Sequence, residues 1–177
     1  MTTPTTDLLF DREAIRSVCD AIRTRERFVI TSHVRPDGDS IGSAVALADG
    51  LRAIGKHARV VNRDTPPIQY QAFPGVGAIE IAGTVDGAFD ALVVLECGDL
   101  GRTGLQGIDE AFIINIDHHP GNTGYGQVRW FDGSAAACAE MVYAVLQELG
   151  APLTAAMATH LYVAIVTDTG SFRYPGV

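Results

Sequence analysis

The sequence predicts an α/β fold in which a mainly parallel, Rossmann-like sheet is flanked by helices. Short apolar runs alternate with longer segments of helical periodicity along the 177 residues, and this alternation is typical of a right-handed parallel sheet. The run over 91–95 is apolar at every position, as expected of a strand buried on both faces of such a sheet. Hydrophobic residues make up 47% of the chain and aromatic residues only 7%, so the core is expected to be mostly aliphatic.

The first four elements follow from hydrophobic spacing and from residues that end helices. Residues 11–27 carry apolar side chains close to helical spacing, and 28–31 form a short apolar β run. A second helix is expected over 40–54, because small apolar residues dominate there and Gly55 lies just past its end. Residues 57–62 then resume a strand.

The second half of the chain is expected to add strands and two closing helices. Residues 66–77 are rich in turn-forming residues, which predicts a short helical turn followed by a loop. After the strand at 91–95, a continuous apolar run predicts another at 112–116, and 127–131 forms one further candidate strand in a glycine-rich region. Helices are expected over 134–149 and from 154 to about 167.

Composition limits the compartment and the ligands. The apolar runs are shorter than the ~18 residues of a membrane helix. Residues 1–7 are polar, which argues against a signal peptide, and residues 1–9 are expected to form a frayed tail. Cys19, Cys97 and Cys138 are widely spaced without a C-x-x-C pair, which favours reduced thiols and a cytoplasmic location. The net charge of −8 disfavours long nucleic acid as a ligand. A P-loop motif is absent from the sequence, so metal, arginine and backbone N–H groups would have to bind phosphate.

Polar side chains gather where four segments end. His33, Asp37 and Asp39 lie within seven residues, directly after the first predicted strand. Ligands collect at the carboxyl ends of parallel strands, so we expect the polar clusters to meet in one site. Imidazole and carboxylate groups together predict a two-metal phosphoesterase. The three further clusters are Glu96-Cys97-Gly98-Asp99, Asp117-His118-His119 and Thr167-Asp168-Thr169.

Two of the clusters also have a purely structural interpretation. The Asp37-Gly38-Asp39 segment could be a turn before a helix capped by Ser40, and Asp168 could belong to a turn that ends a helix. His118 and His119, as neighbours behind a strand, are expected to point to opposite sides, one toward metal and one toward substrate. Asp117 would then fix a histidine tautomer through its ring N–H.

Three other side chains are not expected to take part in the site. His57 is expected to be exposed and His160 to be a packed helix residue. Cys97 lies close to a polar cluster but lacks a dedicated base, so a role as nucleophile is disfavoured.

The order H-x-x-x-D-x-D, an acidic residue after the third strand, D-H-H and T-D-T-G resembles the DHH phosphoesterase superfamily, and most closely its nanoRNase and pAp-phosphatase branch. The resemblance covers Asp11 to the last residue and implies a DHH domain over 10–177. In that branch a linker and a second, substrate-binding lobe follow, and we expect that lobe to be absent from these 177 residues. Glu96 aligns with the position that bridges two metals, which is usually Asp, and Asp99 is the alternative carboxylate. The resemblance implies His33 and Asp37 as ligands of one metal, and Asp39, His118 and Asp168 as ligands of the other.

The mixed ligands favour two Mn²⁺ ions per chain, with Mg²⁺ as a substitute. The resemblance implies that His119 contacts the scissile phosphate, with Asp117 as its catalytic partner, and Arg102 and Arg173 are candidate contacts to substrate phosphate. The expected function is hydrolysis of short RNA oligonucleotides or of adenosine 3′,5′-bisphosphate. The alternatives are a manganese-dependent inorganic pyrophosphatase, a cyclic-dinucleotide phosphodiesterase, and a metal-binding fragment with little turnover. We also expect a homodimer or other self-association.

Overall fold

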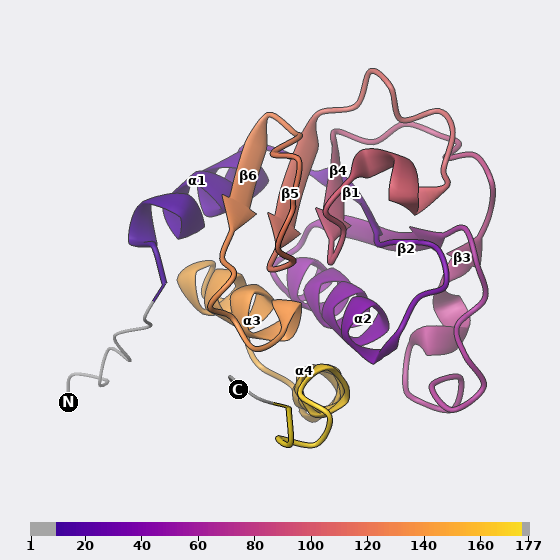
Figure 1. Ribbon diagram of the computed structural model, residues 1–177. Helices are drawn as coiled ribbons and strands as arrows, with labels where there is room; N and C mark the ends of the chain where they lie inside the picture. Colours follow the sequence, from indigo (N-terminus) through magenta and orange to yellow (C-terminus); the bar gives the residue numbers. More distant parts are fainter. Residues whose placement is uncertain (1–9, 175–177) are drawn as a thin grey trace.

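The computed structural model describes residues 10–174, and these build a six-stranded parallel sheet (Figure 1). The strand order is β3-β2-β1-β4-β5-β6, and each neighbouring pair is parallel. The order reverses between β1 and β4, the kind of point where ligands bind in open α/β sheets. The strands are β1 Arg27–Thr31, β2 His57–Asn62, β3 Glu80–Ile81, β4 Ala91–Leu95, β5 Ile113–Asp117 and β6 Val128–Phe131.

All four α-helices contribute to the same buried cluster on one face of the sheet. Helices α1 to α3 contact the strands, whereas α4 contacts α2 and α3 and forms an outer layer. Within residues 10–174, none of the helices combines the length and the apolarity that crossing a bilayer would require. The helices are α1 Arg12–Arg23, α2 Gly38–Ala53, α3 Cys138–Glu148 and α4 Ala155–Asp168, with short 3₁₀ turns at Val76–Ala78 and Leu100–Thr103.

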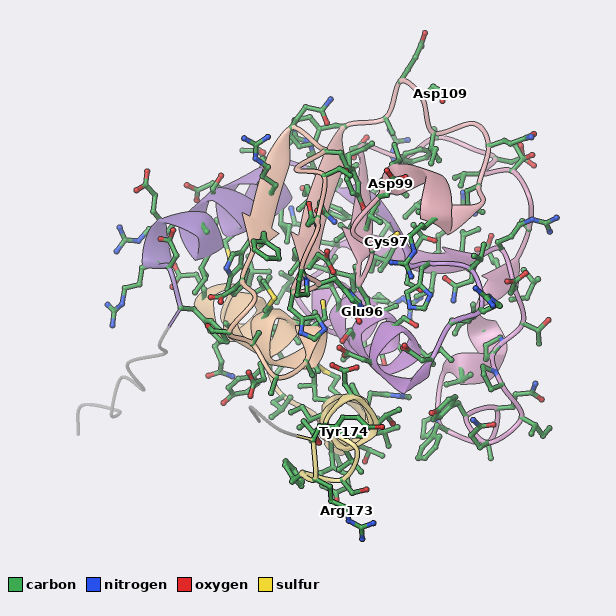
Figure 2. The ribbon with its side chains drawn as sticks, viewed as in Figure 1. Glu96, Cys97, Asp99, Asp109, Arg173 and Tyr174 are labelled. Atoms are coloured by element: carbon green, nitrogen blue, oxygen red, sulfur yellow. The ribbon has the colours of Figure 1, made fainter. Side chains whose placement is uncertain are left out.

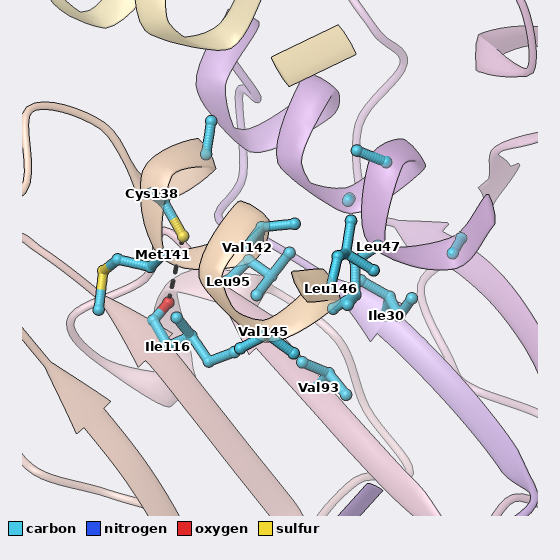
Figure 3. Close-up of a cluster of buried hydrophobic side chains, with 14 of the residues drawn as sticks. Ile30, Leu47, Val93, Leu95, Ile116, Cys138, Met141, Val142, Val145 and Leu146 are labelled. Atoms are coloured by element: carbon cyan, nitrogen blue, oxygen red, sulfur yellow. Dashed lines mark hydrogen bonds between the residues drawn. The ribbon is translucent and has the colours of Figure 1, made fainter. Parts of the chain in front are cut away.

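The core is aliphatic, as the composition predicts. Figure 3 shows Val93, Leu95 and Ile116 of the sheet beneath Leu47 of α2 and Val142 of α3. The other face of the sheet carries a smaller cluster that the loops between the later strands cover. Every residue of β4 is buried, which confirms the prediction for 91–95.

Helices α2 and α4 approach each other closely at Gly42. A Cβ atom at this position would lie 2.5 Å from the backbone oxygen of His160 and 3.0 Å from the Cβ of Ala164. Real Cβ atoms do not approach backbone this closely, so only glycine fits. The close approach brings the carboxyl end of α4, with Asp168, toward the amino end of α2.

The predicted fold class is confirmed, with differences at element ends. Helix α2 begins at Gly38 rather than at residue 40, because Asp37 accepts a hydrogen bond from the backbone N–H of Ser40 at 2.9 Å. Asp37, not Ser40, is therefore the N-cap. Helix α3 begins at Cys138 rather than at 134, because Ser134 is held in a turn by Asp132.

The prediction and the structure also differ at the end of α1 and at β3, and they agree on two histidines. Helix α1 ends at Arg23 rather than at residue 27, and the short strand β3 was not predicted. His57 is exposed and His160 is buried, as expected. The tail assigned to residues 1–9 lies outside the described residues.

Candidate metal centre

The polar clusters predicted from the sequence meet at the carboxyl ends of β1, β4 and β5. Figure 2 shows Glu96 just past the end of β4, close to helix α2. Three overlapping sets of side chains each place one ligand-capable atom per residue within 4.8 Å of one another, and Glu96 belongs to all three. Two of them, which we call the two ligand sets, consist of the predicted ligands, so the Glu96 carboxylate lies where two metal ions would share a ligand. These two sets are His33, Asp37 and Glu96, and Asp39, Glu96, His118 and Asp168; the third set is Glu96, His118 and His119.

The three histidines of the centre have the same orientation. Each Nδ1 lies within hydrogen-bond distance of an oxygen: 2.8 Å from the Val34 carbonyl for His33, 2.9 Å from the Ala135 carbonyl for His118, and 2.9 Å from Asp117 for His119. These acceptors assign the proton to Nδ1, because a carbonyl or carboxylate oxygen can only accept. Each Nε2 is then the ring nitrogen left to bind a cation or a substrate oxygen, after loss of any proton that it carries, as in metal sites whose second ring nitrogen is held by an outer partner.

The Nε2 atoms converge on the carboxylates. That of His118 lies 3.3 Å from Glu96 and 3.4 Å from Asp168, and that of His119 lies 3.4 Å from Glu96. The expectation that His118 and His119 point to opposite sides is therefore wrong. Strand β5 ends at Asp117, so the alternation of side chains along a strand no longer applies to the two residues that follow.

Asp39 is fully buried at the amino end of α3. Its carboxylate accepts hydrogen bonds from the Ser43 hydroxyl at 2.7 Å and from the backbone N–H groups of Cys138 and Ala139 at 2.6 and 3.1 Å. Burial, with the nearby charge of Glu96, raises the pKa of Asp39. A carboxylate has about four lone-pair positions, so these bonds leave room for a metal.

Glu96 is the strongest evidence that the centre is built for a cation. Its side chain is fully buried, and its Oε2 atom accepts no hydrogen bond from residues 10–174. Its φ of 57° lies in the left-handed region, a conformation that costs about 1–3 kcal/mol and persists only where the surroundings enforce it. His118 Nε2 lies 3.3 Å from the Oε2 atom, but a buried carboxylate oxygen that accepts no hydrogen bond is still costly. A divalent cation would offset that cost, so the residues present fit a metal.

The charges in the centre also shift the pKa values of His118 and Asp37. Burial alone would lower the pKa of His118, but the hydrogen bond and charge of Glu96, with the Ala135 carbonyl and Asp39, raise it to about 10. Burial alone would raise the pKa of Asp37, but hydrogen bonds from His33 and from the backbone N–H of Ser40 lower it to about 2. In the metal-free protein His118 therefore carries a proton at neutral pH, and binding of a metal at its Nε2 must displace that proton.

The structure adds polar residues that sequence reasoning missed. Asn122 donates to Asp117 at 2.6 Å and to the side-chain oxygen of Asn115 at 2.9 Å, so it holds the carboxylate that holds His119. Ser43 supports Asp39 in the same way. Ser43 lies one helical turn after Asp39, a spacing that could have indicated this pair, whereas the Asn122 contact depends on the loop after β5, for which the sequence carries no periodic signal.

The remaining candidates differ in position. Asp99 is exposed and caps the 3₁₀ turn Leu100–Thr103 by accepting from the Gly101 N–H at 2.8 Å, so it lies outside the two ligand sets. Arg102 is exposed on that turn, and its carbonyl accepts from the Val34 N–H at 2.8 Å, next to His33. Arg173 is exposed just past α4, and Figure 2 shows it pointing away from Glu96.

Cys97 is fully buried beside the centre. Burial raises the pKa of its thiol to about 11. A thiol with so high a pKa is a poor nucleophile at neutral pH, which agrees with its interpretation from the sequence.

Comparison with known proteins identifies the family of this chain. The profile of the DHH family, N-terminal domain, matches residues 27–165. The chain belongs to the DHH family. It is 35% identical over 164 residues to the bifunctional oligoribonuclease and PAP phosphatase NrnA of Thermus thermophilus, covering 92% of this chain and 49% of the relative. The predicted family is thereby confirmed.

Solved structures share the fold. An exopolyphosphatase-related protein from Bacteroides fragilis aligns with a TM-score of 0.84 at 22% identity, covering 95% of this chain and 53% of that protein. The exonuclease RecJ bound to manganese aligns with a TM-score of 0.54 at 20% identity, covering 97% of this chain and 46% of RecJ. The chain thus spans about half the length of the curated relative and of the solved structures it matches.

Proposed function

We propose that this DHH domain is the metal-binding, catalytic part of a two-metal phosphoesterase that hydrolyses short RNA oligonucleotides and adenosine 3′,5′-bisphosphate. The observation that carries the proposal is the position of Glu96 in two ligand sets at once. The substrate class is supported by the NrnA relative, whose name describes an oligoribonuclease and PAP phosphatase.

The proposed ligands divide between two Mn²⁺ ions. His33 and Asp37 would hold one ion, and Glu96 would bridge to the second. A mixed set of imidazole and carboxylate favours manganese over magnesium, which prefers oxygen and water. When bound, the ions would neutralise charge on the phosphate and activate the attacking water. The second ion would be held by Asp39, His118 and Asp168.

His119 is proposed to contact the scissile phosphate rather than a metal. Its Nδ1 proton is held by Asp117, which leaves Nε2 as the reactive atom. Its side chain is 37% exposed, compared with 13% for His118, so substrate can reach it. Arg102, next to His33, would bind a further phosphate oxygen, and Arg173 would require a change of direction to do so.

The test is an assay of this chain with manganese, and separately with magnesium, on an RNA dinucleotide, adenosine 3′,5′-bisphosphate, pyrophosphate and a cyclic dinucleotide. We expect hydrolysis of the first two with manganese, and none by Asp39→Asn. Hydrolysis of pyrophosphate or of the cyclic dinucleotide alone would replace the proposed substrate. Metal binding without turnover of any substrate would identify a binding domain.

Manganese is expected to stabilise the fold, because it binds only where the carboxylates are assembled. A ligand at a hundredfold excess over its Kd adds about 2.7 kcal/mol, which for a chain of this size is a rise in melting temperature of roughly 5–10 °C. Thermal unfolding with manganese and with chelator measures this rise. Equal melting temperatures would contradict a formed metal site.

Replacing Asn122 by alanine is expected to lower turnover by about 10- to 100-fold, as is usual for partners that orient a functional side chain. Manganese stoichiometry should be unchanged, because Asn122 contacts Asp117 rather than a proposed ligand. Steady-state kinetics and metal analysis measure both quantities. Asn62→Ala, which changes a buried asparagine at the end of β2, is the control, and an equal loss of turnover in both variants would assign the effect to folding.

Two further properties are proposed on less direct grounds. Cys19, Cys97 and Cys138 are all free and buried, which supports a cytoplasmic location.

Large apolar side chains on or just after α4 are exposed, with Tyr162 at 63% and Phe172 at 64%. This surface supports self-association, for which sedimentation of the wild-type chain and of Tyr162→Ser is the test.

A further inference from the structure

A second cavity lies at the opposite end of the sheet from the metal centre. It has a volume of about 550 Å³ and is lined by residues at the amino ends of β1 and β2, by helix α2 and the segment after it, and by the loop before β4. Arg27 and His57 are the first residues of their strands, whereas the metal centre follows the last ones. A five-residue strand spans roughly 16 Å at about 3.3 Å per residue. The cavity is therefore not part of the candidate catalytic site.

The ionisable groups that line this cavity are all basic, although the chain has a net charge of −8. Four of its thirteen arginines and lysines are among them, including its single lysine. None of the aspartates or glutamates of residues 10–174 lines the cavity. The carboxylates that pair with these cations lie outside the lining, so the groups that face the cavity are basic and favour an anionic ligand. The basic lining groups are Arg27, Arg52, Lys56, His57 and Arg59.

Arg27 and Arg52 each keep an N–H donor available after forming their hydrogen bonds within the protein. Arg27 uses Nε and Nη2 to bind Asp90, and Arg52 uses Nε for the Ala58 carbonyl and Nη1 for Asp49. The other terminal nitrogen of each guanidinium has no partner among residues 10–174, and the same is true of the His57 ring.

The remaining two cations are also paired from outside the cavity lining. Lys56 contacts Glu26 at 2.7 Å and the Arg23 carbonyl at 3.3 Å, and Arg59 pairs with Glu80. These carboxylates therefore hold the cations in place without occupying the cavity. Lys56 and Arg59 are partly buried, whereas Glu26 and Glu80 are exposed to water, which weakens both ion pairs. A ligand with more negative charge can therefore compete for the same donors.

We propose that this cavity binds a small phosphorylated molecule of nucleotide size. Guanidinium groups bind phosphate oxygens through two parallel N–H bonds, and an ammonium adds a point charge. The volume falls within the usual range of small-molecule sites, about 300–1,000 Å³. The half-buried ring of Phe89 supplies an apolar wall for a base or sugar. The proposal is independent of the proposed catalytic function.

Calorimetric titration of ADP into the chelator-treated chain tests the proposal, because the metal-free catalytic carboxylates do not attract an anion. We expect binding of one ADP per chain, with at least a tenfold loss of affinity in Arg27→Gln/Arg52→Gln. Adenosine, which lacks phosphate, should not bind. The matched control is Arg16→Gln/Arg129→Gln, which removes the same charge from surfaces outside the cavity lining, and it should bind like the wild type.

Three outcomes would overturn the proposal. They are the absence of saturable binding at millimolar ADP, an equal loss in the control variant, and a loss in Arg102→Gln, which lies on the metal-centre side. Thermal unfolding establishes that each variant is folded. If Arg27→Gln/Arg52→Gln does not fold, Lys56→Gln serves in its place, with the same tenfold loss expected.

Discussion

Replacing Glu96 by glutamine is expected to reduce manganese-dependent hydrolysis by about 10³-fold or more, which corresponds to roughly 4 kcal/mol of transition-state stabilisation. Glutamine keeps the size of the side chain but removes the charge that two cations would share. Glu96 is the residue that belongs to both ligand sets, so its loss should weaken both metal positions at once. Metal analysis after manganese loading should therefore give less than two ions per chain.

The same substitution should leave the metal-free fold intact. Glu96 is buried with an oxygen that lacks a hydrogen bond from the described residues, in a cluster that also holds Asp39 and Asp168. Removing one negative charge should not lower the melting temperature in chelator, because the protonated His118 keeps Asp168 and Asp39 at 3.4 and 4.0 Å from its Nε2. Asp99→Asn is the matched control, since Asp99 is exposed and caps a 3₁₀ turn. Full activity and two bound ions in Glu96→Gln, or a loss in Asp99→Asn, would move the bridging role away from Glu96.

The sequence predicted the parts of the centre that follow from strand topology. Asp39, Glu96 and His118 each follow a strand directly or within a short loop, and parallel strands bring such residues to one edge. That rule needs only the order of strands and helices, which hydrophobic periodicity reveals. The family resemblance favoured Glu96 over Asp99, but residue spacing alone could not decide between them, because the two are three residues apart and the direction of each side chain depends on the turn between them.

Other features depend on loop conformation or on the packing of distant helices and could not be predicted. Asn122 reaches Asp117 through a glycine-rich loop whose path no local pattern specifies. The directions of His118 and His119 were predicted wrongly because they lie past the end of a strand. Asp168 was predicted to join the site, but the sequence gives no physical reason for helix α4 to lie beside α2. That reason is the packing at Gly42.

Gly42→Ala is expected to destabilise the fold by about 1–3 kcal/mol, the usual cost of overpacking a core. Alanine favours a helix over glycine by about 1 kcal/mol, which works in the opposite direction. The added Cβ would lie 2.5 Å from the backbone oxygen of His160, and backbone within a helix cannot move away without shifting α4 as a whole. The clash should therefore outweigh the gain in helix propensity, and the shift should also draw Asp168 away from Asp39 and His118.

Gly50→Ala is the matched control on the same helix. Its added Cβ would meet the Cδ2 atom of Leu146 at 2.2 Å, the far end of a flexible side chain that can change rotamer without moving α4. We expect Gly42→Ala to lower both the free energy of unfolding in urea and the affinity for manganese, and Gly50→Ala to lower stability less and leave manganese affinity unchanged. Manganese affinity that falls equally in both variants would mean that general loss of packing, rather than the position of α4, controls the metal centre. Unchanged affinity in Gly42→Ala, with stability reduced, would show that Asp168 does not bind the metal.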